Sequence, residues 1–422
     1  MNFDPKIIRL FIENNLNHLS VQIMKYKLIF FIINCILFSS DKPYLIIVSL
    51  DGYRYDYSDI VSTPNLDYIK KNGIKSKSLK PVFPSLTFPN HYSIATGCYA
   101  DDHKITGNIF YSKEYNEYYS YKNPSTVQDG KYYGCEPMWV TLEKNKIKTA
   151  TYFWIGSEAE IQGFRPSIYK KYNSTIDYKS RIDSAMHWID LPEDRSPQLI
   201  MLYFDEPDHS GHHYGPTSAS TLNQIAKMDS LMGYLLLQID KRKNDKKINL
   251  IVLSDHGMSD VDESKIVFID EYLSIPNQYN FYGQGSFMQI EILESLLKLN
   301  IDEFETIPNI KYYFKNQIPL EFHFKNLNTQ DILLVAEEGY LIGLKKDKDN
   351  GIFKLKGMHG YDPKNINMHG IFYAMGPHFK NNIEIETLDN VQIYSLVCNF
   401  FNINSSSQSN NINNFDFKNI LK

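Results

Sequence analysis

The pattern that most constrains the fold is a set of short apolar runs that lead into acidic or histidine residues. Three of these runs lie within residues 44–52, 199–208 and 248–257, and a fourth apolar run, within residues 370–377, follows the segment GMHGYDP. Near-continuous runs of Ile, Leu and Val of this length are typical of strands that are buried on both faces, as in a parallel sheet. The sequence therefore predicts a buried, mostly parallel sheet.

Helical patterns lie between these runs. Residues 217–240 carry one stripe of apolar side chains spaced by three or four positions, namely Leu222, Ile225, Met228, Met232, Leu235 and Ile239. The alternation of strands and helices predicts an α/β fold with a doubly wound sheet flanked by helices. Residues 41–402 are predicted to form the main domain, with a small α+β insertion at about 268–342. The Asn- and Ser-rich residues 403–422 are predicted to be a flexible tail.

Charge and cysteine content exclude two classes of protein. The formal net charge of -5 and the pI near 6.2 offer no basic surface for a nucleic-acid polymer. Four cysteines are too few for a disulfide scaffold, and without a CxxC pair any metal must be held by carboxylate and imidazole groups. A bridge between Cys98 and Cys135 is one option in an oxidising compartment, but the spacing leaves it open.

Residues 24–40 have the layout of an export signal. Met24 is followed by two lysines, an apolar run over 28–38 that only Asn34 interrupts, and then small residues. The run is too short for a comfortable membrane span. Because Phe38 makes cleavage after Ser40 unfavourable, an uncleaved membrane anchor is the alternative. The protein is predicted to be exported, with residues 1–23 as an upstream extension.

Six side chains of metal-binding type follow the predicted strands or lie in a glycine-flanked loop. Ligands of doubly wound sheets gather beyond the carboxyl ends of the strands, and crowded carboxylates there repel one another unless cations neutralise them. Asp and His are ligands that zinc accepts. We therefore predict a metal centre from Asp51, Asp208, His212, Asp255, His256 and His359. The neighbouring histidines are predicted to be structural (His91, His369) or exposed and outside the ligand set (His209, His213).

A threonine in the segment FPSLTFPNHYSIATG, residues 83–97, is the candidate nucleophile. Thr87 is expected just before a helix that has Pro89 near its first turn, where proline is tolerated. A hydroxyl at a helix N-terminus lies near unpaired amide donors and the positive end of the dipole. A zinc ion beside it would lower its pKa further. The alternative is that Thr87 only caps the helix.

In its motifs and their order, the chain resembles the ectonucleotide pyrophosphatase/phosphodiesterase family of the alkaline phosphatase superfamily, in its compact catalytic-core form. The similarity extends from Tyr44 to about Phe401. It rests on SLDGYR at Asp51, FPSLTFPNHYSIATG at Thr87, FWIGSE at Trp154, YFDEPDHSGHHYGP at Asp208, LSDHGM at Asp255 and GMHGYDP at His359. The resemblance implies an alkaline phosphatase-like fold and a hydrolase that cleaves nucleotide phosphodiester or pyrophosphate bonds.

The resemblance also implies two zinc ions per subunit and a role for each ligand. One ion would be held by Asp208, His212 and His359, and the other by Asp51, Asp255 and His256 with Thr87 as an additional ligand. Asn108 would donate a hydrogen bond to a phosphate oxygen. The implied reaction is a double displacement: Thr87 forms a covalent phospho-threonine intermediate, and water then releases the nucleoside 5'-monophosphate.

The implied substrate is a small nucleotide whose base stacks between Phe88 and Tyr172, because aromatic rings hold bases with little preference among them. Trp154 and Tyr203 would line the same pocket. Hydrolysis of choline phosphodiesters or lysophospholipids on the same machinery is an alternative, since Glu158 and Glu160 could surround a quaternary ammonium. A non-catalytic binding protein with this fold is a second alternative.

Overall fold

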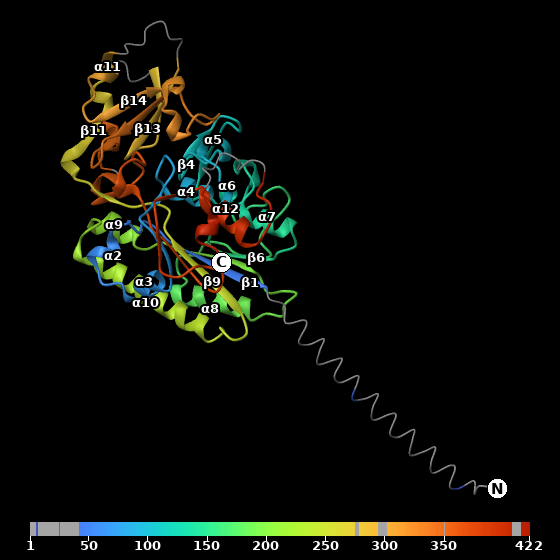
Figure 1. Cartoon of the computed structure of the whole chain (residues 1–422). Helices are drawn as coiled ribbons and strands as arrows, with labels where there is room; N and C mark the ends of the chain where they lie inside the picture. The colour runs from blue at the N-terminus through green and yellow to red at the C-terminus, as the bar shows by residue number, and fades with distance from the viewer. Residues whose placement is uncertain are drawn as a thin grey trace. The chain divides into compact units, whose positions relative to one another are not determined.

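The computed structural model describes Lys6, Lys25 and residues 42–274, 278–293, 302–349, 351–406 and 415–422. Apart from Lys6 and Lys25, the predicted extension and the predicted signal or anchor segment lie outside the described residues. Pro43–Lys422 form one compact unit (Figure 1). Within the described ranges, no helix combines the length and the apolar character that a membrane span requires.

An eight-stranded sheet forms the centre of this unit, in the order β19-β2-β18-β9-β1-β8-β6-β7. β1 is parallel to β8 and β9, and β6 is parallel to β8 and β7. The strands are β1 (Pro43–Leu50), β2 (Gly73–Ser76), β6 (Thr149–Tyr152), β7 (Ile168–Lys170), β8 (Leu199–Phe204), β9 (Lys247–Leu253), β18 (Phe372–Met375) and β19 (Ile383–Ile385). The predicted mostly parallel α/β fold is confirmed.

One strand of this mostly parallel sheet runs in the opposite direction to its neighbours. The run at 370–377 does form a strand, β18, but it is antiparallel to its neighbours β9 and β2. A short buried run has the same composition in either direction, so the apolar pattern could not reveal this reversal.

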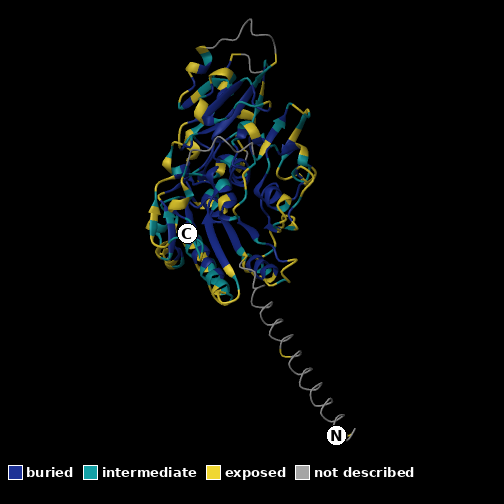
Figure 2. Cartoon of the chain, turned by 45° about the vertical axis from the view of Figure 1, so that its right-hand side comes forward, coloured by how far each residue is buried: buried dark blue, intermediate teal, exposed yellow. Residues whose placement is uncertain are grey.

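Helices cover both faces of the sheet, and β1 shows why. Its side chains alternate, so Leu45 and Ile47 pack in one apolar cluster while Ile46 and Val48 pack in another. The first cluster includes residues of α4 (Thr87–Thr96), α7 (Met138–Lys144) and α12 (Gln392–Phe400), and the second includes residues of α3 (Pro64–Lys71), α8 (Tyr178–Ile189) and α10 (Ala219–Asp240). Figure 2 shows the sheet as the buried layer.

α10 confirms the predicted helical stripe. The helix begins after Ser218, whose side chain accepts a hydrogen bond from the amide of Thr221 and so caps the first turn. Ile225, Met228, Met232 and Leu235 of the stripe are buried, and Leu222 and Ile239 at its ends are half-buried.

The stretch predicted as an insertion contains a second sheet and an apolar cluster of its own. This antiparallel sheet has the order β12-β13-β15-β14, with β12 (Tyr279–Tyr282), β13 (Phe287–Ile292), β14 (Ile310–Phe314) and β15 (Ile332–Ala336). β11 (Ile266–Phe268) pairs with β16 (Leu341–Gly343) where the chain enters and leaves this region. The chain then returns to the site through β17 (Gly357–Met358).

The end of the predicted flexible tail is packed. Ile420 is buried, and Leu421 forms a bridge with Phe379. The amide of Lys380 donates to the carbonyl of Ile420. The prediction of a flexible tail is therefore wrong for residues 415–422, because aromatic and aliphatic side chains there complete the core beside α12.

Candidate active site

The acidic residues lie where the strands end. Asp51 follows β1, Asp208 comes shortly after β8, and Asp255 comes shortly after β9. Because these strands are parallel and in register, their carboxyl ends meet at one edge of the sheet. The structure brings all six predicted metal ligands together there in two groups, Asp208/His212/His359 and Asp51/Asp255/His256, each with ligand atoms within 4.8 Å of one another.

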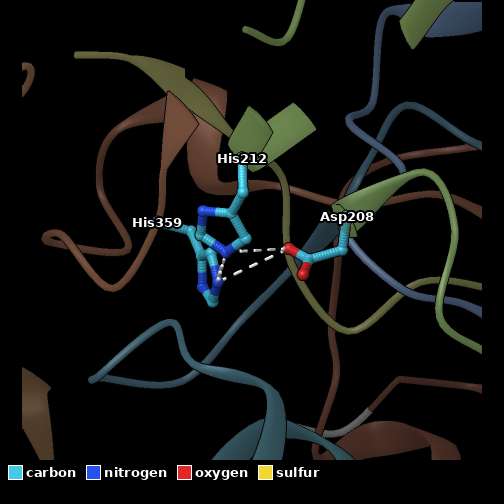
Figure 3. A group of neighbouring side chains, drawn as sticks. All are labelled: Asp208, His212 and His359. Carbon is cyan, nitrogen blue, oxygen red and sulfur yellow. Dashed lines mark hydrogen bonds and ion pairs between the residues drawn. The ribbon is translucent and has the colours of Figure 1, made fainter. Parts of the chain in front are cut away.

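The first group is built by a short helix and a returning loop (Figure 3). α9 (Asp208–Tyr214) begins at Asp208, so His212 lies four residues later on the same side of the helix. Nε2 of His212 and Nε2 of His359 each lie 3.5 Å from Oδ1 of Asp208. The two Nε2 atoms are 3.1 Å apart. All three side chains therefore point toward one small volume.

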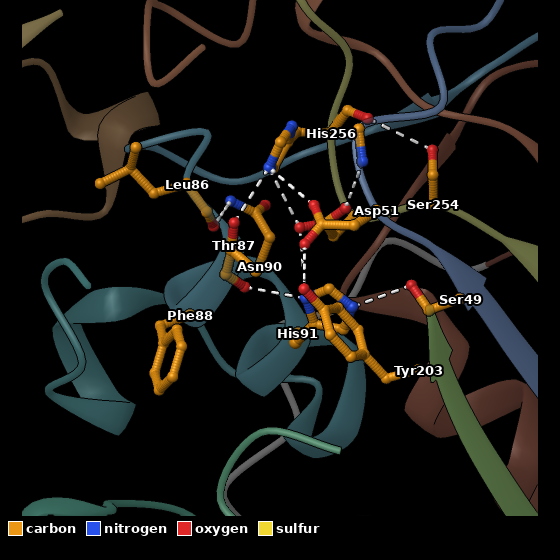
Figure 4. A network of polar contacts seen from close by, with 12 residues as sticks. Ser49, Asp51, Leu86, Thr87, Phe88, Asn90, His91, Tyr203, Ser254 and His256 are labelled. Atoms are coloured by element: carbon orange, nitrogen blue, oxygen red, sulfur yellow. Dashed lines mark hydrogen bonds and ion pairs between the residues drawn. The ribbon is translucent and has the colours of Figure 1, made fainter. Parts of the chain in front are cut away.

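The second group is built around His256 (Figure 4). Its Nε2 lies 3.3 Å from Oδ1 of Asp51 and 3.2 Å from Oδ2 of Asp255. The hydroxyl oxygen of Thr87 lies 3.3 Å from the same Nε2 atom. The rings of His256 and His359 stack with their centroids 3.6 Å apart, so the two groups are direct neighbours.

Backbone carbonyls fix the tautomer of all three histidines. A carbonyl oxygen only accepts, so the Nδ1 atom that contacts it carries the hydrogen and a neutral ring presents an unprotonated Nε2. Burial, followed by the charges of His256 and His212, holds the pKa of His359 well below its ordinary value, so this ring is neutral. The carbonyls belong to Gly357, Gly257 and Ser85, which contact His212, His256 and His359 respectively, each at 2.8 Å.

These residues fit divalent cations. Oδ1 of Asp51, Oδ1 of Asp208 and Oδ2 of Asp255 are buried and have no hydrogen-bond partner within the described residues. Burial, followed by the charges of Asp255 and Asp208, raises the pKa of Asp51 well above its ordinary value. Bare imidazole nitrogens and carboxylate oxygens that converge in this way repel one another, and a cation between them reverses the sign of that interaction.

Two other predicted pocket residues lie behind the ligands. The hydroxyl of Tyr203 donates to Oδ2 of Asp51 at 2.5 Å, which orients this carboxylate. Trp154 is only 1% exposed, and its indole nitrogen donates to the carbonyl of His91 at 3.3 Å. The ring is enclosed by the core behind α4, and its expected contact with substrate stays a prediction.

His91 connects the nucleophile segment to the second group. Its Nδ1 lies 2.9 Å from the carbonyl oxygen of Thr87 and 3.2 Å from Oδ2 of Asp255. Its Nε2 lies 2.8 Å from the hydroxyl of Ser49. Both ring nitrogens thus have protein partners, which agrees with the expected structural role of this histidine.

Thr87 does not cap its helix. It is the first residue of α4, Leu86 occupies the capping position, and no side chain caps the helix there. The hydroxyl faces His256 instead, with its oxygen 3.3 Å from Nε2 of that ring. The Oδ1 atom of Asn108 accepts the amide hydrogen of Phe88 at 3.0 Å, so the NH2 group of Asn108 is the end that remains available as a donor beside Thr87.

A disulfide joins Cys98 to Cys135. Cys98 directly follows Gly97, the residue that caps the C-terminus of α4, and Cys135 lies shortly before α7. The bond therefore ties the end of the nucleophile helix to its neighbour, and it settles the option that the spacing left open.

The two rings of the predicted aromatic pair, Phe88 and Tyr172, have different neighbours. Phe88 is half-buried and lies 5.8 Å from the ring of Tyr121. Tyr172 is 53% exposed and lies 5.2 Å from the ring of Phe153. Sequence reasoning missed Tyr121, which follows the hairpin of β4 (Ile109–Ser112) and β5 (Glu117–Ser120). Its position in an aromatic run beyond Asn108 was the available signal.

The two glutamates that could have held a choline group are engaged by protein donors. Glu158 accepts the amide of Tyr172 at 2.8 Å and the side chain of Gln128 at 3.0 Å. Glu160 forms an ion pair with Arg165 at 2.9 Å. The charge of Glu160 is therefore balanced within the protein, whereas the donors to Glu158 are neutral and leave its charge unpaired.

A glycine after β1 makes room for Asp208. Gly52 has φ +67°, and a Cβ atom there would lie 2.8 Å from Cβ of Asp208. Gly52→Ala is expected to lower the free energy of unfolding by about 1–2 kcal/mol, because alanine disfavours the left-handed backbone. The clash with Asp208 is expected to lower it by roughly 1–3 kcal/mol more. The variant should also bind less metal.

Gly163→Ala is the matched control, because Gly163 has φ +79° and open space around it. Urea unfolding and elemental analysis compare the two variants. Equal losses of stability in both, with full metal content, would show that the contact with Asp208 does not matter.

The fold and the site define an α/β protein of the alkaline phosphatase-like class with two adjacent groups of metal-binding side chains. The chain belongs to the family described as type I phosphodiesterase / nucleotide pyrophosphatase, which matches residues 45–362.

Relatives with solved structures and curated sequences agree with this assignment. The chain is 32% identical over 375 residues to human ectonucleotide pyrophosphatase/phosphodiesterase family member 1, covering 86% of this chain and 40% of that protein. It is 31% identical over 376 residues to a venom phosphodiesterase of Naja atra, covering 86% and 45%. The chain thus spans less than half the length of these two relatives.

The structural comparison covers most of this chain and the whole of each matched chain. Murine ectonucleotide pyrophosphatase/phosphodiesterase 5 superposes with a TM-score of 0.82 at 31% identity, covering 90% of this chain and 100% of that one. An inactive threonine-to-alanine variant of the murine protein, in complex with AMP, superposes with the same TM-score at 30% identity and the same coverage.

Proposed function

We propose that the protein hydrolyses nucleotide phosphodiester or pyrophosphate bonds and releases nucleoside 5'-monophosphates through a phospho-threonine intermediate at Thr87. The observation that carries this proposal is the position of the Thr87 hydroxyl, 3.3 Å from Nε2 of His256 at the edge of the second ligand group. The inactive threonine-to-alanine variant of the murine relative supports the same assignment.

The proposed cofactor is a pair of zinc ions. Asp208, His212 and His359 would hold one, and Asp51, Asp255 and His256 would hold the other together with Thr87. Mixed His and Asp ligand sets of this size are those of zinc sites that keep a position open. Bound cations would neutralise charge on the phosphate group and lower the pKa of hydroxyl groups at the site.

The chain's own groups then account for both steps. Oγ1 of Thr87 loses its proton to water and attacks phosphorus; a new O–P bond forms, and the bond from phosphorus to the leaving oxygen breaks as that oxygen takes up a proton from solvent or departs as an anion. The NH2 group of Asn108 donates to a phosphate oxygen and stabilises the charge that concentrates there. Water then attacks from the opposite side, which breaks the bond to Thr87 and gives overall retention at phosphorus. Tyr203 keeps Asp51 oriented throughout.

The proposed substrate class is a small nucleotide. Phe88, Tyr121 and Tyr172 provide aromatic surface beside Thr87, and the AMP in the murine variant shows that this relative binds a nucleoside monophosphate. The ion pair of Glu160 with Arg165 removes one of the two carboxylates that a choline site would use and so counts against a choline ester. The resemblance assigns Tyr203 and Trp154 to this pocket as well, but their contacts favour roles behind it.

Loss of the Phe88 ring is predicted to weaken substrate binding. Phe88→Ala is expected to raise KM for a nucleotide diester about 5- to 150-fold, because stacking on an aromatic side chain contributes about 1–3 kcal/mol per base. Steady-state kinetics with a nitrophenyl nucleotide diester measures the change. Phe164→Ala removes an exposed ring that contacts Lys144 and serves as the control. Unchanged KM in Phe88→Ala would remove this residue from the base site.

A comparison of three esters tests the activity itself. Nitrophenyl nucleotide diester, nitrophenyl phosphate and nitrophenyl phosphocholine are offered to the same preparation, with and without a chelator. We expect the nucleotide diester to be hydrolysed fastest and the chelator to abolish turnover. Preference for the phosphocholine ester would overturn the substrate class, and full activity in the chelator would overturn the metal centre.

The place of action and the domain limits are part of the proposal. We infer that residues 41–402 form the catalytic domain, with the insertion at 268–342, and that it works outside the cytoplasm after export through the segment at 24–40. The disulfide between Cys98 and Cys135 supports an oxidising compartment.

A further inference from the structure

The outer side of α9 carries a second pair of histidines. His209 and His213 each follow one of the ligands Asp208 and His212 by one residue, and they are also four residues apart. One residue turns an α-helix by about 100°, so this pair shares a side that differs from the side facing the site. Both side chains are exposed, and their ring centroids lie 4.6 Å apart.

The ring nitrogens of this pair are available. Across the part of the chain that the structure describes, neither imidazole has a hydrogen bond or an ion pair within 4.0 Å, whereas both nitrogens of His91 and of His369 have partners. The carboxylate of Glu206 interacts electrostatically with His209 and adds negative charge nearby. A cation approaching the pair therefore meets two unused nitrogen donors in a favourable field.

The backbone beneath the pair is held firmly. A Cβ atom on Gly357 would lie 2.4 Å from the carbonyl oxygen of Gly211, so α9 and β17 are in close backbone contact. The amide of Lys356 also donates to the carbonyl of His212 at 2.8 Å. Because the helix is fixed, only side-chain rotation is needed for His209 and His213 to face a shared ion, and exposed side chains rotate rapidly.

We propose that His209 and His213 bind a transition-metal ion of the Zn²⁺, Ni²⁺ or Cu²⁺ type at the protein surface, separately from the two ligand groups of the active site. Imidazole suits these ions, and two histidines four residues apart on a helix have the spacing with which helices chelate zinc. The pair supplies two ligands, and water completes the coordination. Binding stabilises α9, whose other side presents Asp208 and His212.

Metal stoichiometry tests this site. The zinc-loaded protein and the variants His209→Ala, His213→Ala and His187→Ala are dialysed against rising free zinc, and bound zinc is measured by elemental analysis. His187 is a single exposed histidine on α8 and is the matched control. We expect wild type and His187→Ala to bind one zinc equivalent more than either of the other two variants.

A second measurement keeps the result interpretable. His209→Gln and His213→Gln retain polar side chains, and turnover of the nucleotide diester should be the same in them as in wild type. The thermal midpoint of wild type should rise with zinc above the level that saturates turnover, and that further rise should be lost in both variants. Equal zinc content in all proteins, or an unchanged further rise in the variants, would overturn the surface site without affecting the proposed hydrolase activity.

Discussion

Thr87→Ala is expected to lower kcat for a nitrophenyl nucleotide diester by roughly 10³-fold or more, because the variant lacks the oxygen that forms the covalent intermediate. The side chain does not cap α4, so the free energy of unfolding should hardly change. Bound zinc should also remain, since three other side chains form each ligand group. Stopped-flow or steady-state kinetics together with elemental analysis provide the measurement.

Thr87→Ser is the informative control for this experiment. It keeps a hydroxyl at the N-terminus of α4 and should retain far more activity than Thr87→Ala, while metal content and stability stay alike in both. If Thr87→Ala turned over at the wild-type rate, the hydroxyl near His256 would have no chemical role. Another nucleophile would then have to be sought.

Asp255→Ala is expected to lower kcat by a similar factor, because it removes a metal ligand. Asp255 is fully buried; it lies 3.2 Å from Nε2 of His256 and accepts the amide hydrogen of Gly52. Without this carboxylate the second ligand group loses a charged member, so the protein should contain about one zinc equivalent less and kcat should fall by roughly 10³-fold.

Asp229→Ala separates this effect from a general loss of stability. Asp229 is also a buried carboxylate. It accepts the amide hydrogens of Asn65 and Leu66 at the start of α3, and neither of these partners is a predicted metal ligand. Both variants should unfold at lower urea concentration than wild type. Only Asp255→Ala should lose zinc and turnover; equal kinetic losses in the two would mean that destabilisation, not the ligand, explains the result.

The fold could be predicted because strands buried on both faces must be apolar along their whole length. The run at β8 met this condition and those at β1 and β9 nearly did, and the stripe of α10 showed the helical period just as plainly. The antiparallel direction of β18 depends on how the chain returns from the insertion, which local composition does not encode. The packing of Ile420 depends on contacts made only after folding.

The candidate site could be predicted in part for the same reason. Parallel strands in register bring Asp51 and Asp255 to one edge, so their proximity follows from the strand pattern alone. The apolar pattern does not tell in which direction a ring at the end of a strand points. The hydrogen bond from Tyr203 to Asp51 and the burial of Trp154 both depend on that direction. The aromatic run beyond Asn108 pointed to Tyr121, but its contact with Phe88 depends on a hairpin that folds back.

The positions of the bound metals test the central claim most directly. Crystals of the zinc-loaded protein, measured on both sides of the zinc absorption edge, locate each ion by anomalous scattering. We predict one ion among Asp208, His212 and His359 and a second among Asp51, Asp255 and His256 beside the Thr87 hydroxyl. The absence of ions from these two groups in zinc-saturated crystals would contradict the account.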